Sequence, residues 1–328
     1  NIFSNDVGIL IFDYKGDYNE NKVDFVKFTD AKVYKPYHLP FNPFALHWSG
    51  TPKPLLPVHT ANTFIDTLSK VYPSLGPKQK SVLLDCINAA YMNCGIHKAN
   101  PATWVNEPPT FLSVYQMYKN DEEIKKGDVL ESALNKISMF EIFEPVSSNT
   151  VGLFELLKGV VVIDLFGYDS DIQNLVVAMT LDLFYSQMQA AGHSKIQGSM
   201  RQISKMILVD EADNFLREGY SSLRKILKEG REFGVGTILS TQFLRHFVTK
   251  EEDYSKYILT WVVHNVRDLA PSDVRFVFNT QSGSSNENQL CADIKSLKKH
   301  ESILKIGNSD TPVYIRDKAF WEYVLEHS

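Results

Sequence analysis

The stretch KMILVDEADNFLREGYSSLRKILKEGREFGVGTILSTQ, residues Lys205 to Gln242, decides the fold that we expect for this chain. It holds two short apolar runs separated by a helical segment that is rich in Lys and Arg. Asp210 and Glu211 directly follow the first run, and a polar triplet that ends at Gln242 follows the second. This order favours two parallel strands joined by a helix, and open α/β sheets bind ligands at the edge where the carboxyl ends of such strands meet. We therefore expect a functional site at that edge.

Two further apolar runs have the same character. Gly8 to Phe12 (GILIF) ends at Asp13 and is followed by turn residues, so Asp13 either supports a turn or belongs to a site. Val160 to Leu165 (VVVIDL) precedes a helix for which Ser170 and Gln173 predict a capping box. Repeated strand–helix units of this kind predict an α/β fold with a doubly wound, mostly parallel sheet.

The rest of the chain is arranged around this sheet. Tyr34 to Pro57, rich in Pro and aromatic residues, is interpreted as an extended surface segment, because each Pro biases the residue before it away from helix. Helical periodicity predicts an α-helical insertion over residues 58–148. Gly283 to Asn288 is expected to be a mobile loop, and the runs Ile303 to Ile306 and Val313 to Ile315 predict a C-terminal β-hairpin.

The composition is that of an ordinary globular protein. Of the 328 residues, 44% are hydrophobic and 22% are charged, and the formal net charge is -5. This charge gives no global basic surface, so any contact with nucleic acid would have to come from a local patch or an oligomeric channel. The three cysteines form no CxxC pair, which argues against a zinc site or a disulfide framework and favours a reducing cytoplasm. No apolar run reaches the roughly 18 residues of a membrane span, because Asp164 and Asp182 interrupt the best candidates, so we expect no membrane association.

The acidic pair after the first apolar run suits phosphoryl transfer. Asp210 is the candidate for holding Mg²⁺ through the water shell that this small cation retains, and Glu211 is the candidate base for the attacking water. A neutral amide after the neighbouring strand can donate to a γ-phosphate and accept from that water, which makes Gln242 a candidate sensor. Each of these residues alone could be an ordinary polar strand end, but all three in this order favour a nucleotide site.

Basic residues supply further candidates. Arg231 either stabilises the end of its helix or directs its fixed fork of donors at nucleotide phosphates. Arg267 follows the apolar run that begins at Ile258 and could act as an arginine finger on a neighbouring subunit. Lys195 and Arg201, in what we interpret as a polar loop, are candidates for DNA contact, although such a loop can also be an ordinary solvated surface.

Several segments of the chain resemble the HerA/FtsK-type ATPases, which are hexameric DNA pumps of the RecA-like P-loop class. The segments are ILIFDYKGDY, LPFNPF, VVVIDLFG, ILVDEADNFL, EGREFGVGTILSTQ and KIGNSDTPVYIRD, and EGREFGVGTILSTQ is the most specific. The resemblance covers most of the chain outside the helical insertion. It implies a RecA-like sheet, hydrolysis of ATP at the subunit interfaces of a ring, and DNA, expected to be double-stranded, threaded through the centre. It also implies that Asp13 and Arg231 belong to the ATP site.

A similarity in the helical insertion and the C-terminal aromatic segment points more narrowly to the HerA-like ATPase of phosphorothioation-dependent restriction systems in bacteria, for which a nuclease partner is conceivable. The phosphate-binding loop of the family, GxxxxGK[ST], occurs nowhere in the 328 residues. In the family it lies one strand and one helix before the segment ILIFDYKGDY. We therefore expect it before Asn1, interpret residues 1–328 as the C-terminal part of one RecA-like domain, and expect this piece alone to bind ATP poorly or not at all.

Two alternatives remain open. Asp210 to Asp213 spell the motif of DEAD-box helicases, but Ser240 to Gln242 stands where those enzymes have Ser-Ala-Thr, and their Arg-rich HRxGRxGR segment is missing. The second alternative is a non-catalytic, ATPase-like scaffold of a DNA-processing complex. The missing phosphate-binding loop favours a scaffold, whereas the presence of Asp210, Glu211 and Gln242 argues against it.

Overall fold

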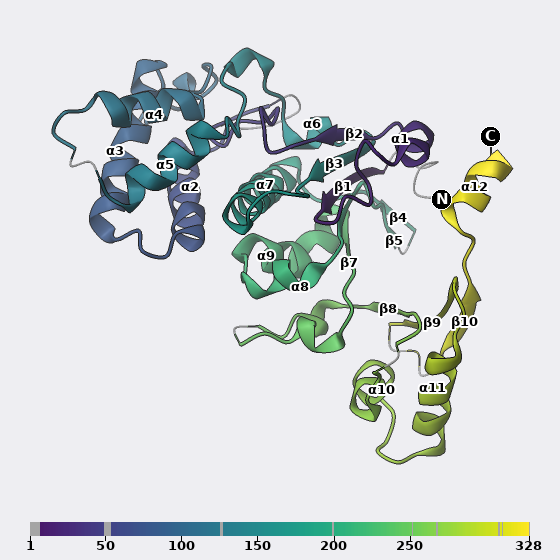
Figure 1. Ribbon diagram of the computed structural model, residues 1–328. Coiled ribbons are helices and arrows are strands. Elements are labelled where there is room, and N and C mark those ends of the chain that lie inside the picture. Colours follow the sequence, from purple (N-terminus) through teal and green to yellow (C-terminus); the bar gives the residue numbers. More distant parts are fainter. Residues whose placement is uncertain are drawn as a thin grey trace. The chain divides into compact units, whose positions relative to one another are not determined.

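The computed structural model describes residues 7–48, 54–124, 127–198, 200–250, 252–266, 268–307, 309 and 311–327 (Figure 1). The chain divides into two compact units, Asn1–Ser240 and Thr241–Ser328, and each is described by itself below. The interpretation of residues 1–328 as part of one domain stays a prediction.

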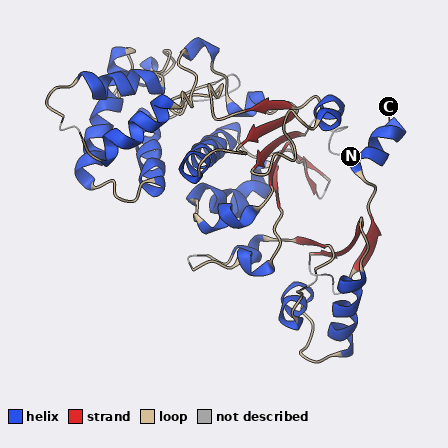
Figure 2. Cartoon of the chain, viewed as in Figure 1, coloured by secondary structure: helices blue, strands red, loops and turns tan. Residues whose placement is uncertain are grey.

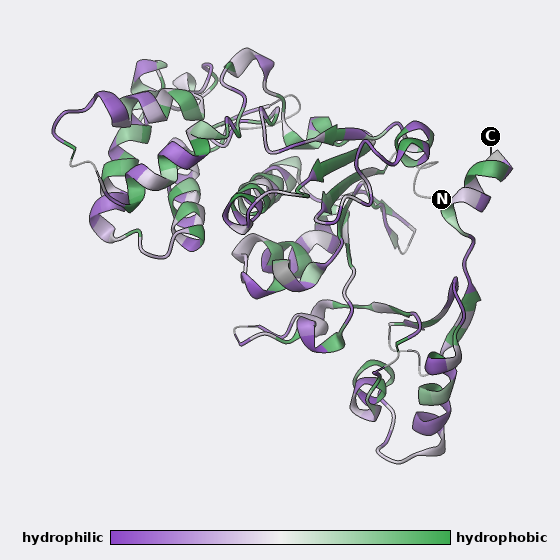
Figure 3. Ribbon diagram, viewed as in Figure 1, coloured by the Kyte–Doolittle hydropathy of each residue, from purple (hydrophilic) through white to green (hydrophobic). Residues whose placement is uncertain are grey.

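A five-stranded parallel sheet forms the centre of the first unit. Its strands are β1 (Gly8–Asp13), β2 (Lys32–Tyr34), β3 (Val160–Asp164), β6 (Lys205–Val209) and β7 (Val235–Leu239). They follow the order β2-β3-β1-β6-β7, and every neighbouring pair is parallel. Every residue of β1 and β3 is buried, as expected for interior strands that are covered on both faces, and Figure 3 shows these strands as hydrophobic. The expected α/β fold with a mostly parallel sheet is confirmed.

Helices cover both faces of this sheet (Figure 2). On one face, Ile9 and Ile11 of β1 pack against Phe25 of α1 (Val23–Thr29). On the other face, the ring of Phe12 lies 5.9 Å from the ring of Phe215. The helices on this second face are the long, largely buried α7 (Ser170–Ala191) and the shorter α8 (Ala212–Arg217) and α9 (Ser221–Glu229). Alternate residues of β1 thus face two different helical layers.

The capping box expected at the start of α7 is wrong. The N-cap is Asp169, whose carboxylate accepts the N–H of Ile172 at 3.1 Å. Gln173 instead donates its side-chain amide to the carbonyl of Leu165 at 2.9 Å. The helix therefore begins one residue earlier than the motif implied, because a carboxylate was available as the cap before Ser170.

Four helices form a bundle between β2 and β3 in the sequence. They are α2 (Pro57–Val71), α3 (Pro77–Asn93), α4 (Phe111–Asn120) and α5 (Val129–Met139). Within the bundle α3 packs on both α2 and α4, and α2 contacts α7. Figure 1 shows the bundle beside the sheet, as an addition to it. The boundaries 58–148 of the insertion stay a prediction.

Within the segment from Tyr34 to Pro57, which we expected on the surface, residues 39–46 are largely buried. Leu39, Phe41 and Phe44 are at most 1% exposed. The ring of Phe44 lies 4.8 Å from the ring of Phe64 in α2, and Leu39 forms an isolated parallel bridge with Phe143. The prolines keep residues 35–48 out of a helix, and the aromatic side chain of Phe44 packs against the helical bundle, because burying it removes a large apolar area from water.

The second unit contains a three-stranded antiparallel sheet. Its elements are β8 (Thr260–Val263), β9 (Glu301–Ile306), β10 (Val313–Arg316), α10 (Pro271–Phe278), α11 (Ser285–Ser296) and α12 (Phe320–His327). β9 and β10 confirm the expected C-terminal hairpin. The mobile loop expected at Gly283 to Asn288 is wrong: Ser284 caps α11 by accepting the N–H of Glu287 at 3.1 Å, and the carboxylate of Glu287 accepts the N–H of Gly283 at 2.5 Å. The Ser-x-x-Glu spacing was readable in the sequence as a helix start.

The remaining elements are short. They are α6 (Leu153–Leu156), β4 (Ile196–Gln197), β5 (Met200–Arg201) and the 3-10 turns η2 (Pro101–Thr103), η3 (Ser147–Asn149), η4 (Gly230–Phe233), η5 (Leu244–Phe247) and η6 (Tyr254–Tyr257). Within the described part of the chain, no helix combines the length and the apolar character that crossing a membrane requires.

Candidate functional site

Three adjacent strands of the central sheet end in an aspartate or directly before one. Asp13 of β1 is directly opposite Asp164 of β3 in the parallel register. On the other side of β1, Phe12 is opposite Val209, so Asp210 follows β6 one position beyond that pair. The sheet thus gathers Asp13, Asp164 and Asp210 at its carboxyl edge. Asp164 was visible as an acid near a strand end, but only the strand order places it next to Asp13.

Asp13 is fully buried, and its carboxylate holds the turn after β1. Its Oδ1 accepts the N–H groups of Lys15, Gly16 and Asp17 at 3.2, 2.8 and 3.0 Å. Its Oδ2 accepts the N–H of Tyr18 at 2.9 Å. The turn-supporting interpretation of Asp13 therefore matches the geometry, and its role at an ATP site stays a prediction. A buried carboxylate is stable here because four donors surround it.

Glu211 has an uncommon backbone conformation. Its φ of 53° and ψ of 50° lie in the left-handed region, where side chains other than those of Gly, Asn and Asp are rarely found. The neighbouring backbone is tied to β7, because the N–H of Ala212 donates to the carbonyl of Ser240 at 2.8 Å and the N–H of Ser240 donates to that of Val209 at 3.0 Å. Strained residues of this kind concentrate at functional sites, which supports a functional role for Glu211.

Lys15 forms an ion pair with Glu211 across 196 residues of sequence. The Nζ atom of Lys15 donates to Oε1 of Glu211. The side chain of Glu211 is 19% exposed and that of Lys15 is 47% exposed. The hydrogen bond to Glu211 raises the pKa of Lys15, and the charges of Asp210 and Asp17 contribute to the same effect. Lys15 was not among the residues expected at the site. The available signal was its place two residues after Asp13, in the turn that follows β1.

The edge carries a negative electrostatic environment. Burial raises the pKa of Tyr18 to about 12, and the charges of Asp210, Asp13 and Asp17 act in the same direction. Burial also raises the pKa of Asp164, which the N–H of Phe166 opposes by donating to its carboxylate at 3.1 Å. A cation would offset the repulsion among these acids.

A Mg²⁺ site at this edge remains a prediction from the sequence. No cluster of three or more His, Cys, Asp or Glu side chains suited to a metal occurs among the described residues. Mg²⁺ needs only one or two carboxylates because it keeps several of its waters. Asp210, partly exposed at the end of β6, is the residue that could hold such an ion.

The predicted basic residues of the first unit lie at the opposite end of the sheet. Arg231 is exposed in η4, immediately before β7, whose five residues span roughly 16 Å. Within one chain the structure therefore does not bring Arg231 to the edge that carries Glu211, and its role at an ATP site stays a prediction. The DNA-contact candidates lie near Arg231, because Arg201 donates to the carbonyl of Glu232 at 3.4 Å.

The polar loop expected around Lys195 and Arg201 is a short hairpin of β4 and β5. Arg201 also donates to the carbonyl of Ser194 at 3.4 Å, so its guanidinium fastens the base of the hairpin. Lys195 is exposed beside it, and Ile196 and Met200 are 64% and 75% exposed. The hairpin thus offers a basic and apolar surface at the amino ends of the strands.

Two predicted residues cannot be placed at this edge. Gln242 belongs to the second unit, so its sensor role stays a prediction. Arg267 lies outside the described residues, and its role as an arginine finger also stays a prediction.

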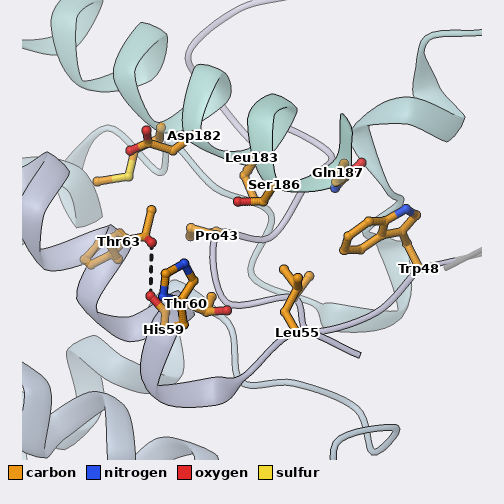
Figure 4. A pocket seen from close by; sticks show the side chains of 13 residues that line it. Pro43, Trp48, Leu55, His59, Thr60, Thr63, Asp182, Leu183, Ser186 and Gln187 are labelled. Atoms are coloured by element: carbon orange, nitrogen blue, oxygen red, sulfur yellow. Dashed lines mark hydrogen bonds between the residues drawn. The ribbon is translucent and has the colours of Figure 1, made fainter. Parts of the chain in front are cut away.

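A separate pocket lies between α2 and α7 (Figure 4). Its lining includes Trp48, His59 and Asp182. Asp182 accepts hydrogen bonds from the hydroxyls of Thr67 in α2 and Ser222 in α9. The cavity volume of about 30 Å³ holds only about two water molecules, which is too small for a nucleotide. The pocket therefore does not compete with the sheet edge as a nucleotide site.

Comparison with known proteins shows two kinds of likeness. No family model matches the chain. The DNA double-strand break repair helicase HerA of Sulfolobus acidocaldarius is 23% identical over 314 residues, covering 92% of this chain and 56% of that protein. The protein of the same name from Sulfurisphaera tokodaii is 22% identical over 316 residues, with the same two coverages. The chain thus spans about half the length of the curated relatives it matches.

Among solved structures, VirB4 of Thermoanaerobacter pseudethanolicus aligns with a TM-score of 0.65 at 16% identity, covering 97% of this chain and 83% of VirB4. The bacterial conjugative coupling protein TrwB, as its ΔN70 form, aligns with a TM-score of 0.50 at 12% identity, covering 95% and 78%. At these identities the likeness concerns the fold alone. The expected RecA-like α/β architecture is confirmed.

Proposed function

We propose that this chain is part of an ATP-driven DNA motor, a translocase or helicase of the HerA/FtsK type, in which Glu211 is the catalytic base. The observation that carries the proposal is the common edge of the sheet, where Asp13, Asp210 and Glu211 follow adjacent parallel strands and Glu211 is held in a left-handed conformation. The similarity to HerA helicases over 92% of the chain supports a DNA motor over other uses of this fold.

Each residue of the edge has a distinct task in this proposal. Asp210 would hold Mg²⁺ through its waters, and the bound ion would supply positive charge to the phosphates. Glu211 would accept the proton of the attacking water, which is the role of a base within hydrogen-bond reach of that water. Asp13 would shape the turn that carries Lys15, since four N–H groups of that turn donate to it. Gln242 would orient the water or sense the γ-phosphate, as the family resemblance implies.

The first test is steady-state ATP hydrolysis by the full-length protein, with and without double-stranded DNA. Glu211→Gln should lower kcat by about 10²-fold or more, because it removes the base while keeping the size of the side chain. Glu218→Gln is the matched control, since Glu218 is an exposed carboxylate at the end of the same helix, α8. Equal rates for wild type and Glu211→Gln would remove Glu211 from the mechanism, whereas a wild type that hydrolyses no ATP would leave a non-catalytic scaffold as the better account.

DNA contact is assigned to the β4–β5 hairpin, through Lys195. Because Arg201 is engaged with two carbonyls, Lys195 is the cleaner residue to replace. Lys195→Gln should weaken DNA binding and reduce the slope of log binding constant against log salt concentration by about one unit, because one phosphate contact is lost. The loss of affinity should be smaller at high salt. Lys158→Gln, at a lysine that is 76% exposed, is the control. An unchanged salt slope for Lys195→Gln would exclude this contact.

The finer parts of the proposal concern the assembly. We infer a homo-oligomeric ring, with six subunits as the first expectation, in which Arg231 and Arg267 act on the nucleotide of a neighbour. Mixing Arg267→Ala subunits with Glu211→Gln subunits should restore some hydrolysis, because mixed rings regain some intact composite sites. An absence of complementation counts against action in trans.

The biological setting is a further part of the proposal. The resemblance favours a bacterial cytoplasmic restriction system that acts on phosphorothioated DNA, with a nuclease as partner. Hydrolysis stimulated differently by phosphorothioated and unmodified plasmids of the same sequence would support this setting. Equal stimulation by both plasmids would remove the modification from the proposal without affecting the motor itself.

A further inference from the structure

We propose that Lys15 is a positioning residue that holds the carboxylate of Glu211 at the edge of the sheet. The inference rests on the proposed function, because it assigns a role to the ion pair only if Glu211 acts as a base. It differs from that proposal in the residue that it identifies and in the experiment that tests it.

Both partners of the ion pair have a fixed backbone. The turn that carries Lys15 is held by the buried carboxylate of Asp13, which accepts the N–H of Lys15 itself at 3.2 Å. Gly16 completes this turn with a φ of 77°, and a Cβ there would lie 2.8 Å from the side-chain amide of Asn19. The turn therefore has little freedom to place Lys15 elsewhere.

Glu211 is fixed from the other side. It follows β6, the parallel neighbour of β1, and the next residue, Ala212, is hydrogen-bonded to the carbonyl of Ser240. A long lysine side chain from the turn after one strand thus meets a glutamate from the end of the adjacent strand. The pair is set by the sheet register and by two anchored turns, and is not a contact between two mobile surface residues.

The surrounding charges favour a positioning role. Asp210 from the end of β6 and Asp17 from the turn after β1 are the acids that act on Lys15 besides Glu211. The ammonium of Lys15 thus lies among several carboxylates and donates to that of Glu211. On α8, the nearby acid Asp213 is paired with Arg217 at 3.3 Å. Lys15 therefore fixes the direction of the Glu211 carboxylate, which serves a base.

The main test compares three variants of the full-length protein in steady-state ATP hydrolysis. Lys15→Met keeps the aliphatic stem and removes the charge, and should lower kcat by about tenfold with a much smaller change in KM, because a misplaced base loses rate rather than substrate binding. Lys15→Arg should recover most of the rate, because a guanidinium can still donate to the Glu211 carboxylate.

Lys22→Met is the matched control. Lys22 lies seven residues further along and is paired with Asp17 at 3.5 Å, and both of these side chains are about half exposed. It should leave kcat and KM unchanged. An active wild type whose kcat is the same in Lys15→Met overturns the inference and leaves the proposed function standing. A wild type that hydrolyses no ATP overturns the proposed function and this inference with it.

A second measurement reports the pair without relying on hydrolysis. Acylation of lysine amines, followed by mass spectrometry, measures how much of each amine is unprotonated. Because Glu211 raises the pKa of Lys15, Glu211→Gln should increase the labelling rate of Lys15 about twofold or more and leave that of Lys22 unchanged. Equal labelling of Lys15 in wild type and Glu211→Gln would show that the pair does not form, and the positioning role would fall.

Discussion

The left-handed backbone of Glu211 makes a quantitative prediction that separates folding from chemistry. Glu211→Gly and Glu211→Ala both remove the carboxylate and the ion pair with Lys15, so these losses cancel when the two variants are compared. At a φ of 53° an alanine pays about 1–2 kcal/mol of backbone strain that glycine does not. Glycine loses about 0.5–1 kcal/mol more than alanine through chain entropy. The Gly variant should therefore be more stable than the Ala variant by about 0.5–1 kcal/mol.

Equilibrium urea unfolding of both variants measures this difference, and thermal unfolding should give the Gly variant a Tm about 1–4 °C higher for a unit of this size. The control is the same pair of substitutions at Glu218, where φ is -71° and the backbone is right-handed. There the order should reverse, with the Ala variant more stable. Both Glu211 variants should be deficient in ATP hydrolysis. An Ala variant at Glu211 that is as stable as the Gly variant would refute the strained conformation.

Three further predictions concern buried positions. Asp13→Asn should lower the free energy of unfolding by about 1–3 kcal/mol in urea titrations, because an amide cannot accept all four N–H groups that the carboxylate accepts. An unchanged free energy of unfolding would argue against these four hydrogen bonds. Burial raises the pKa of Asp182 above its ordinary 3.8, so the folded state takes up a proton more readily than the unfolded chain. As the pH rises from about 3.8 through the raised pKa, the free energy of unfolding of the wild type should therefore fall relative to that of Asp182→Asn. Parallel pH dependences of unfolding in these two proteins would contradict that assignment. Gly234→Ala should destabilise the fold more than Gly167→Ala, by about 1 kcal/mol or more. Both glycines have a positive φ, but only at Gly234 would a Cβ approach a backbone carbonyl oxygen, at 2.4 Å. Equal losses of Tm in the two variants would show that this carbonyl can move aside.

The local elements of the fold followed from the sequence where apolar runs and their polar ends were distinctive. The strands that end at Asp13, Asp164 and Val209 are apolar throughout or nearly so, because both faces of an interior parallel strand are buried. The prediction from sequence failed where one local pattern is compatible with two structures. The aromatic segment around Phe41 is non-helical as its prolines require, but whether such a segment is exposed or buried depends on what packs against it. At Ser284 the helix start was overlooked although its spacing was present.

The sequence by itself determined the acids of the site, because an acid directly after a buried strand is a local feature and chain direction alone assigns it to the carboxyl end. Only the tertiary structure decided which strand ends are neighbours, and therefore that Lys15 meets Glu211 across 196 residues. It also decided that Arg231, close to Glu211 in the sequence, lies at the other end of β7. The physical reason is that strand order and register follow from the packing of whole faces, in which every buried side chain takes part, whereas periodicity records only which side of its own element a residue occupies.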